Sequence, residues 1–285
     1  MTSNGPARLS VVVPVYNEEK KIVETVRRIS AFLSLKGQPA ELIVVNDGSK
    51  DKTRQIMQSL PQQEHGVFLR FLDSDVNHGK GYACRQGMLE AKGRYILLTD
   101  ADLSSPIKES DKLVAALERG SDVAIGSRAV REEGCDVQQS LKRRIAGRIF
   151  NFFVQLLVLP GIRDSQCGFK CFTNEAAQKL FRAQKLDGFS FDVEVLYLAR
   201  KSGYQIAEVP VMWIQGEDSR VSFFRDSTRM LKDLFKINKI HSGEVWLYKN
   251  EKAISAVGEG LQAVREGKVR KAKENYSKYI DEADT

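Results

Sequence analysis

Short apolar runs alternate with longer amphipathic segments through the N-terminal part of the chain, and this alternation permits few folds. The apolar runs are rich in Val, Ile and Leu and predict buried strands, while the segments between them carry apolar residues at helical spacing. We expect strands at 9–15, 41–45, 67–72 and 94–99, and helices at 20–35, 51–60 and 80–91. Regular strand–helix alternation predicts parallel strands with right-handed crossovers, and therefore an α/β fold with a mostly parallel central sheet flanked by helices.

Polar clusters follow three of the predicted strands directly. They are Tyr16–Glu19, Asn46–Ser49 and Asp100–Asp102. In open parallel sheets, ligands bind beyond the carboxyl ends of the strands. We therefore expect these three clusters to converge on one crevice of the nucleotide-binding kind.

The alternation loosens after a further strand at 122–125. We expect a basic stretch leading into an apolar helix at 137–159, a polar segment at 164–173, a helix at 191–200, a strand at 205–213 and an amphipathic helix at 222–239. The tail from 243 onward has helical propensity interrupted by glycines. We divide the chain into a main domain, 1–240, and a small helical appendage, 241–285, and homo-oligomerisation through that appendage stays open.

Composition and net charge limit the kinds of molecule that this protein can be expected to bind. The chain has 285 residues, a net charge of +7 and 42% hydrophobic residues, which suits a folded protein with a basic surface. A basic surface suits nucleic acid, anionic lipid or a phosphorylated substrate. We expect no nucleic-acid partner, because the sequence has no RNA-binding aromatic motif, no zinc-finger spacing and no long Lys/Arg block. No signal peptide is recognised and the four cysteines form no CxxC pair, which favours a cytosolic setting with free thiols.

Two of the polar clusters have alternative interpretations. Asp100 and Asp102, just past a strand, could hold one Mg²⁺ or Mn²⁺ ion against a diphosphate, or could be a solvated acidic loop. Asp47, in the second cluster, could accept hydrogen bonds from a base or ribose. The same cluster is also typical of a turn that precedes the next helix.

Six short blocks of this sequence together resemble the inverting GT-A glycosyltransferases of family 2. The blocks are Val13–Glu18, Val45–Ser49, Asp100–Asp102, Gly126–Arg128, Arg163–Lys170 and Phe191–Glu194. The last three are similar to the dolichyl-phosphate β-glucosyltransferase and dolichyl-phosphate mannose synthase branch, and Gln166–Lys170 is nearer the glucosyltransferases. The resemblance covers about residues 8 to 240 and implies a GT-A, Rossmann-like fold.

The resemblance also implies roles for single residues. The donor site would contain Pro14, Tyr16, Glu18, Asp47, Asp100 and Ala101. Asp100 and Asp102 would bind the metal ion, Asp164 would act in catalysis, and Arg128 would reach the acceptor phosphate. Lys80 would lie near the donor, or is a solvated lysine at a helix start. Asp192 and Glu194 either orient the sugar or buttress the fold.

Basic and apolar residues gather in two segments that suit a lipid acceptor. No run reaches the ~20 apolar residues of a spanning helix. Helices at about 140–162 and 222–239 are instead expected to lie at an anionic membrane surface, although 149–162 also suits a core helix and the second helix could simply pack on the domain. Arg143, Arg144 and Arg220 are candidates for the acceptor phosphate.

The resemblance implies an inverting transfer of a hexose to a polyprenyl phosphate at the cytoplasmic face of a membrane. The donor would be a nucleotide-sugar, with UDP-glucose favoured and GDP-mannose as the alternative. A soluble acceptor also stays open, as does a nucleotide-sugar-binding protein without turnover. The intact carboxylate pair and Arg128 argue against the latter.

Overall fold

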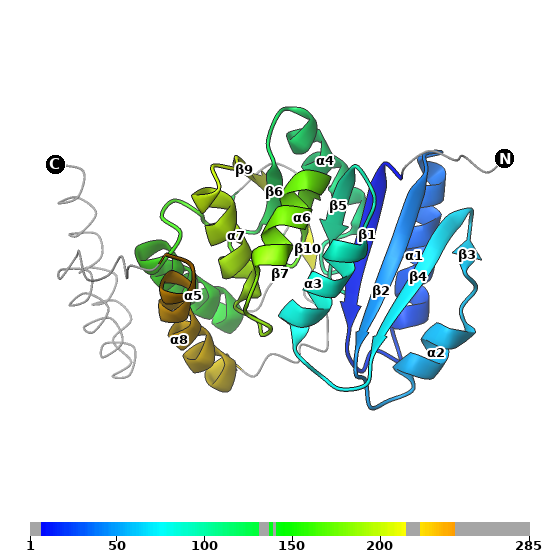
Figure 1. Ribbon diagram of the computed structural model, residues 1–285, viewed down its shortest axis with the longest axis horizontal. Helices are drawn as coiled ribbons and strands as arrows, with labels where there is room; N and C mark the ends of the chain where they lie inside the picture. The colour runs from blue at the N-terminus through cyan, green and yellow to red at the C-terminus, as the bar shows by residue number, and fades with distance from the viewer. Residues whose placement is uncertain (1–6, 131–136, 139–140, 215–222, 243–285) are drawn as a thin grey trace.

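A mostly parallel sheet runs through the centre of the protein (Figure 1). The computed structural model describes residues 7–130, 137–138, 141–214 and 223–242. The sheet strands are β1 Leu9–Val15, β2 Ala40–Asp47, β3 Gln63–Glu64, β4 Val67–Ser74, β5 Tyr95–Leu98, β6 Val123–Ser127, β8 Lys170–Thr173 and β9 Ile206–Pro210. Their order is β3-β4-β2-β1-β5-β8-β6-β9, and β3 and β8 run antiparallel to their neighbours. A separate parallel pair joins β7 Val137–Gln138 to β10 Trp213–Ile214.

Helices cover both faces of this sheet (Figure 1). They are α1 Ile22–Leu35, α2 Thr53–Ser59, α3 Lys80–Glu90, α4 Ser110–Glu118, α5 Leu141–Leu157, α6 Asn174–Ala183, α7 Phe191–Lys201 and α8 Phe223–Ser242, with a short 3₁₀ turn, η1 Ile107–Glu109, before α4. Val12 of β1 contributes to the core beneath α3, α6 and α7, while its neighbours Val11 and Val13 contribute to the core beneath α1 and α4. Burial on both faces explains why the central strands β1, β2 and β5 contain continuous apolar runs.

The predicted α/β architecture is confirmed, but several elements were not predicted. The strands expected at 9–15, 41–45, 67–72 and 94–99 all form, with ends shifted by a few residues. The helices α4 and α6 were missed. The segment 164–173 was expected only to be polar, but its last four residues form the largely buried antiparallel strand β8 between β5 and β6.

The apolar part of α5 packs into the protein. Phe153, Val154 and Leu157 are almost completely buried in the same core as α7 and α8, and α5 lies beside α8. The described part of 149–162 therefore fits the core-helix alternative. The side chains of 141–146 and the tail 243–285 lie outside the described residues, so the predicted appendage and oligomerisation do too. Within the described part, none of the helices has the length and hydropathy to span a bilayer.

Candidate functional site

The three polar clusters meet at one edge of the sheet, as predicted. β1 is parallel to both β2 and β5, with Val15 opposite Asn46 and Val12 opposite Leu98. The carboxyl ends of the three strands therefore point the same way, toward the lower side of Figure 1. Asp47 and the Asp100–Asp102 cluster lie at this edge, to which β1 contributes Tyr16 and Glu18.

Asp47 is nearly buried and holds the loop before α3. Its carboxylate accepts hydrogen bonds from Asn77 Nδ2 at 2.8 Å and from the backbone N–H groups of His78 and Gly79 at 2.9 and 2.8 Å. The side chain of neighbouring Asn46 accepts the backbone N–H of Ser49 at 3.2 Å, so the predicted turn is present. Asp47 thus fixes the loop that leads to Lys80.

The Asp100 carboxylate lies between Lys80 and Gly168. Lys80 Nζ is 2.6 Å from Asp100 Oδ1, so Lys80 is a partner of the acidic pair and not a solvated helix-start lysine. A Cβ atom built on Gly168 would lie 2.1 Å from Asp100 Oδ2, which means that only glycine allows this approach. Asp102 is exposed, and its Oδ1 accepts the backbone N–H of Ser104 at 2.9 Å. Among the described residues it has no cationic partner.

Charges of alternating sign continue inward from Asp100. Burial alone would lower the pKa of Lys80, but the negative charges of Asp100 and Asp192 raise it well above its ordinary value. Asp192 in turn is 2.5 Å from the buried ammonium of Lys170, which also donates to the carbonyl of Cys167. Asp192 therefore neutralises a buried lysine, which favours the buttressing alternative for this residue.

Arg128 and Asp164 form a second ion pair. Arg128 directly follows β6, and Asp164 lies in the segment that leads to β8. Arg128 Nε and Nη2 lie 2.7 and 2.8 Å from the two carboxylate oxygens, and the Arg128 backbone N–H donates to the same carboxylate. The guanidinium also lies 5.5 Å from the centre of the Trp213 ring. Burial would raise the pKa of Asp164, but Arg128 lowers it below its ordinary value. Both groups are therefore charged near neutral pH.

Two residues that the sequence did not single out for this site hold the backbone around Asp164. Glu208 of β9 accepts the N–H groups of Arg163 and Asp164 at 3.0 and 2.9 Å. Asn151 of α5 donates to the carbonyls of Ile162 and Arg163 at 3.2 and 2.7 Å. Asn151 interrupts an apolar helix, which is the signal that could have identified it.

Some of the remaining predicted residues are described by the structure, and three arginines are not. Pro14, Tyr16 and Glu18 lie at or just past the end of β1 and are half-buried, whereas Ala101 is buried and its carbonyl accepts the Thr25 hydroxyl of α1 at 2.6 Å. The described structure does not include the side chains of Arg143 and Arg144 or any part of Arg220. The acceptor-phosphate role of these three arginines stays a prediction.

The described cysteines are buried, free thiols. They are Cys84, Cys167 and Cys171. Burial raises the pKa of Cys167 to about 11 and that of Cys171 to about 12, so both thiols are neutral at physiological pH. Cys135 lies outside the described residues.

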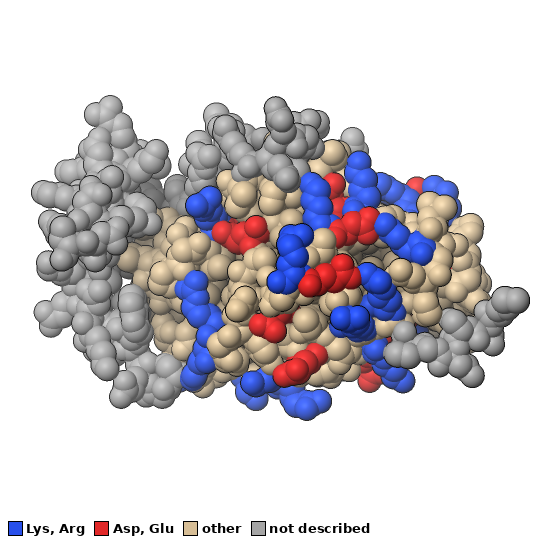
Figure 2. Space-filling model, turned by 90° about the horizontal axis from the view of Figure 1, so that it is seen from above, with Lys and Arg blue, Asp and Glu red and all other residues tan. Residues whose placement is uncertain are grey.

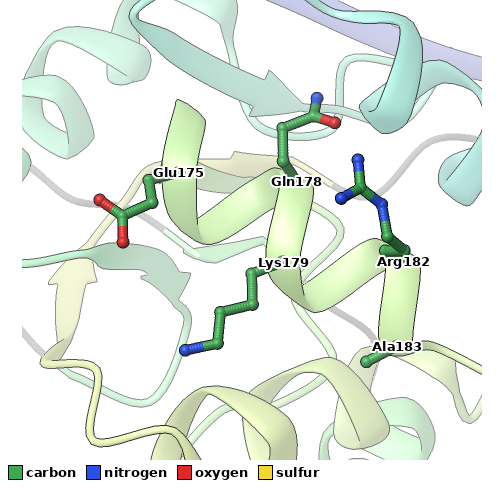
Figure 3. Close-up of a pocket in the computed structure, with 5 residues that line it drawn as sticks. All are labelled: Glu175, Gln178, Lys179, Arg182 and Ala183. Atoms are coloured by element: carbon green, nitrogen blue, oxygen red, sulfur yellow. The ribbon is translucent and has the colours of Figure 1, made fainter.

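A surface hollow of about 460 Å³ lies away from the predicted site, along α6 (Figure 3). Its lining residues all belong to this one helix and its end: Glu175, Gln178, Lys179, Arg182 and Ala183. Their side chains point in different directions and do not converge on a common point. None of the predicted donor or acceptor residues contributes to it.

Charges of both signs are mixed on the face opposite the strand carboxyl ends. Figure 2, seen from above, shows lysine and arginine side chains interspersed with aspartate and glutamate. This face therefore does not present charge of a single sign.

Comparisons with known proteins agree with this architecture. The family model described as glycosyl transferase family 2 matches residues 10–181. A dolichyl-phosphate β-glucosyltransferase of Drosophila melanogaster is 40% identical over 80% of this chain and 74% of its own length. The Homo sapiens protein of the same name is 37% identical over 84% of this chain and 77% of its own length.

Two solved structures share the fold at low sequence identity. Glucosyl-3-phosphoglycerate synthase from Mycobacterium tuberculosis, in complex with Mn²⁺ and UDP-glucose, has a TM-score of 0.57 at 18% identity and covers 82% of this chain and 79% of its own. A mannosyltransferase from Pyrobaculum calidifontis, in complex with GDP-Man and Mn²⁺, has a TM-score of 0.58 at 16% identity and covers 98% and 76%. The predicted GT-A fold is thus confirmed. With a family model matching more than half of its length and relatives at 37–40% identity, the chain belongs to glycosyl transferase family 2.

Proposed function

We propose that this protein transfers glucose from UDP-glucose to a dolichyl-type polyprenyl phosphate with inversion at C1. The observation that carries the proposal is the similarity to proteins named dolichyl-phosphate β-glucosyltransferase, 40% identical to this chain in the Drosophila case. The site supports it, because acidic, basic and aromatic side chains meet at the carboxyl edge of β1, β2 and β5, where this class of sheet binds nucleotides.

The donor would lie between the end of β1 and the Asp100–Asp102 cluster. Pro14, Tyr16 and Glu18 provide half-buried surface for the base and ribose. Lys80 provides a fixed positive charge next to Asp100, where the diphosphate would lie. A preorganised cation there stabilises the negative charge that develops on the departing UDP.

The residues present fit a divalent cation. Asp102 is exposed, oriented by the Ser104 N–H and unpaired with any described cation, and Asp100 is two residues away. Carboxylate oxygens are the ligands that Mg²⁺ and Mn²⁺ prefer. In the described part of the chain, no group of three or more His, Cys, Asp or Glu side chains is placed to hold a metal. Asp100 and Asp102 would therefore hold the ion together with diphosphate and water oxygens. When bound, the ion would neutralise charge on the diphosphate.

The acceptor needs positioning more than deprotonation. A phosphate monoester is anionic near neutral pH, so one of its oxygens can attack C1 without a strong general base. The new bond joins that oxygen to C1, the bond from C1 to the UDP oxygen breaks, and UDP leaves with the electron pair. Arg128 is the described candidate for the acceptor phosphate. Asp164 holds its Nε and Nη2, which leaves Nη1 to reach the phosphate.

The exposed side of α8 suits contact with a lipid surface. Phe235 and Ile240 are 42% and 46% exposed, and they lie among the exposed lysines Lys232, Lys236 and Lys239. Apolar side chains flanked by lysines are typical of helices that lie at an anionic membrane interface. This supports peripheral membrane contact, with α8 nearer the lipid acceptor than the sheet edge formed by β3 and β4.

Release of UDP in the presence of a short polyprenyl phosphate tests the proposal. The purified protein would be given UDP-glucose or GDP-mannose, each with Mg²⁺ or Mn²⁺, and with or without acceptor. We expect acceptor-dependent UDP release from UDP-glucose and a β-linked lipid product. Release from GDP-mannose alone, or glucosyl transfer to a soluble hydroxyl compound only, would contradict the proposal.

A further inference from the structure

Glu194 lies away from the reacting groups, although it belongs to the same sequence block as Asp192. It is completely buried on α7. Its Oε1 accepts the backbone N–H of Lys185 and its Oε2 that of Leu186, both at 2.8 Å. His241 Nε2, near the end of α8, is 2.5 Å from Oε1. Glu194 therefore fixes residues 184–187, here called the 184–187 segment, and links them to α8.

The 184–187 segment in turn is hydrogen-bonded to the start of α3. The carbonyl of Asp187 accepts the N–H groups of Gly81 at 2.7 Å and Tyr82 at 3.2 Å. Gln184 Nε2 donates to the carbonyl of Gly81 at 2.9 Å. The approach is so close that a Cβ atom on Gly79 would lie 2.4 Å from the Asp187 carbonyl oxygen. The first turn of α3 thus cannot move independently of the segment.

Lys80 lies in that first turn. Its backbone is flanked by Gly79 and Gly81, and its ammonium is 2.6 Å from Asp100. A shift of the segment by a fraction of an ångström would therefore pass directly to this ion pair. Catalytic sites tolerate displacements of only about 0.5 Å in their charged groups.

We infer that Glu194 is a positioning residue of the donor site, acting through the 184–187 segment on Lys80. The inference rests on the proposed function only for the identity of the donor. The contacts that connect Glu194 to Lys80 do not depend on that function. Glu194→Gln keeps the size of the side chain and replaces one acceptor oxygen by an NH₂ group. That group would face a backbone N–H or the imidazole of His241, so at least one hydrogen bond is lost.

A double-mutant cycle on donor affinity distinguishes positioning from general stabilisation. The affinity of the full-length protein for UDP with Mn²⁺ would be measured by calorimetry for the parent, Glu194→Gln, Lys80→Met and the double variant. We expect Glu194→Gln to weaken binding roughly 10-fold, as outer-shell changes do. In the Lys80→Met background it should have no further effect, because Lys80 carries the coupling. Fully additive effects would overturn the inference.

Glu41→Gln is the matched control. Glu41 is also a buried glutamate that accepts a backbone N–H, that of Lys92 at 2.7 Å, but it lies at the amino edge of β2. Its substitution should leave UDP affinity within about twofold of the parent, since none of its contacts in the described part of the chain reaches the first turn of α3. A weakening equal to that of Glu194→Gln would mean that any buried glutamate has the same effect.

Amide hydrogen exchange provides a test that needs no nucleotide. In Glu194→Gln we expect faster exchange at Lys185 and Leu186 and also at Gly81 and Tyr82, with the amides of β1 unchanged. Unchanged exchange at Gly81 and Tyr82 would overturn the inference. If the parent protein binds no UDP, the proposed donor is wrong, and the exchange measurement alone then decides whether Glu194 controls the start of α3.

Discussion

Asp100 and Asp102 are two residues apart but differ in their surroundings. Asp100 pairs with Lys80 and lies against Gly168, whereas the described contacts of exposed Asp102 are limited to the Ser104 N–H. Asp102 is therefore the carboxylate better placed to take a cation without first releasing a protein partner. In the proposed function both carboxylates would hold the ion, and Asp100 in addition pairs with Lys80.

Replacing Asp102 should remove transfer and leave the fold intact. We expect Asp102→Asn to lower the rate of UDP release at least about 100-fold, because the metal-holding carboxylate is lost. Thermal unfolding should change little, since the side chain is exposed. Asp111→Asn, which removes an exposed carboxylate paired with Lys36, is the control and should keep parental turnover. Normal turnover of Asp102→Asn in saturating Mg²⁺ would disprove the metal role.

Asp164 should stabilise the protein in a pH-dependent way. Arg128 lowers the folded-state pKa of Asp164 below its ordinary value of 3.8, so this stabilisation is present above that pH and is lost as the pH falls through the lowered folded-state pKa. Asp164→Asn leaves the partly buried Arg128 without its partner, at a cost of up to about 3 kcal/mol near pH 7. Urea unfolding at pH 7 and at progressively lower pH checks this. The difference between parent and variant should shrink in acid, and a constant difference would contradict the assignment.

At the scale of elements, local patterns predicted the first half of the sheet better than the second. The strands β1, β2 and β5 contain continuous apolar runs followed by polar clusters, so both their burial and their ligand edge could be predicted. β8 could not, because it contains Lys170. The charge of Lys170 is balanced by Asp192, which lies on a different helix. No local pattern reveals such a partner.

For the candidate site too, contacts between residues that are distant in the sequence could not be predicted. The sequence placed Asp47 and Asp100 together at one edge and left Lys80 open between the donor site and solvent, but it did not show what each residue contacts. Asp47 bonds a loop that starts thirty residues later, and Glu194 bonds a segment on the other side of α3. For 149–162, an apolar helix pattern fits both a core and an interface, and only the packing against α8 favours the core for the described part.

Asn151 should couple α5 to the Asp164 segment. Asn151→Ala leaves the carbonyls of Ile162 and Arg163 without their side-chain donor, which should cost about 1–2 kcal/mol and lower the turnover number. Gln155→Ala, on the same helix, is the control, because Gln155 makes none of these contacts. Urea unfolding and initial-rate kinetics would be measured for both variants. Equal effects of the two substitutions would show that the loss does not come from the contacts of Asn151 with the Asp164 segment.

At the scale of the whole molecule, the proposed donor and acceptor sites lie over different parts of the sheet. The proposed donor residues follow the central strands β1, β2 and β5, while α5, α7 and α8 gather toward the end of the sheet that contains β8 and β6 (Figure 1). Asp164 and Arg128 lie on the β6 side of the donor residues, and Asn151 links Asp164 to α5. A lipid phosphate arriving along α8 would therefore reach C1 of the sugar from the side opposite α1 and α2.

This arrangement predicts that α8 controls binding to anionic vesicles. In Lys232→Glu/Lys239→Glu, two exposed lysines of α8 change sign. Each lysine near an anionic surface contributes about 1 kcal/mol, so the double variant should bind vesicles containing phosphatidylserine at least roughly 30-fold more weakly. Parental binding should weaken as salt screens the charges.

Arg8→Glu/Lys36→Glu makes the same charge change on the far side of the molecule and should bind like the parent. Co-sedimentation would compare the three proteins, and turnover with a short, water-soluble polyprenyl phosphate should be equal in all of them. Equal vesicle binding by both double variants would mean that net charge, and not the α8 surface, brings the protein to the membrane.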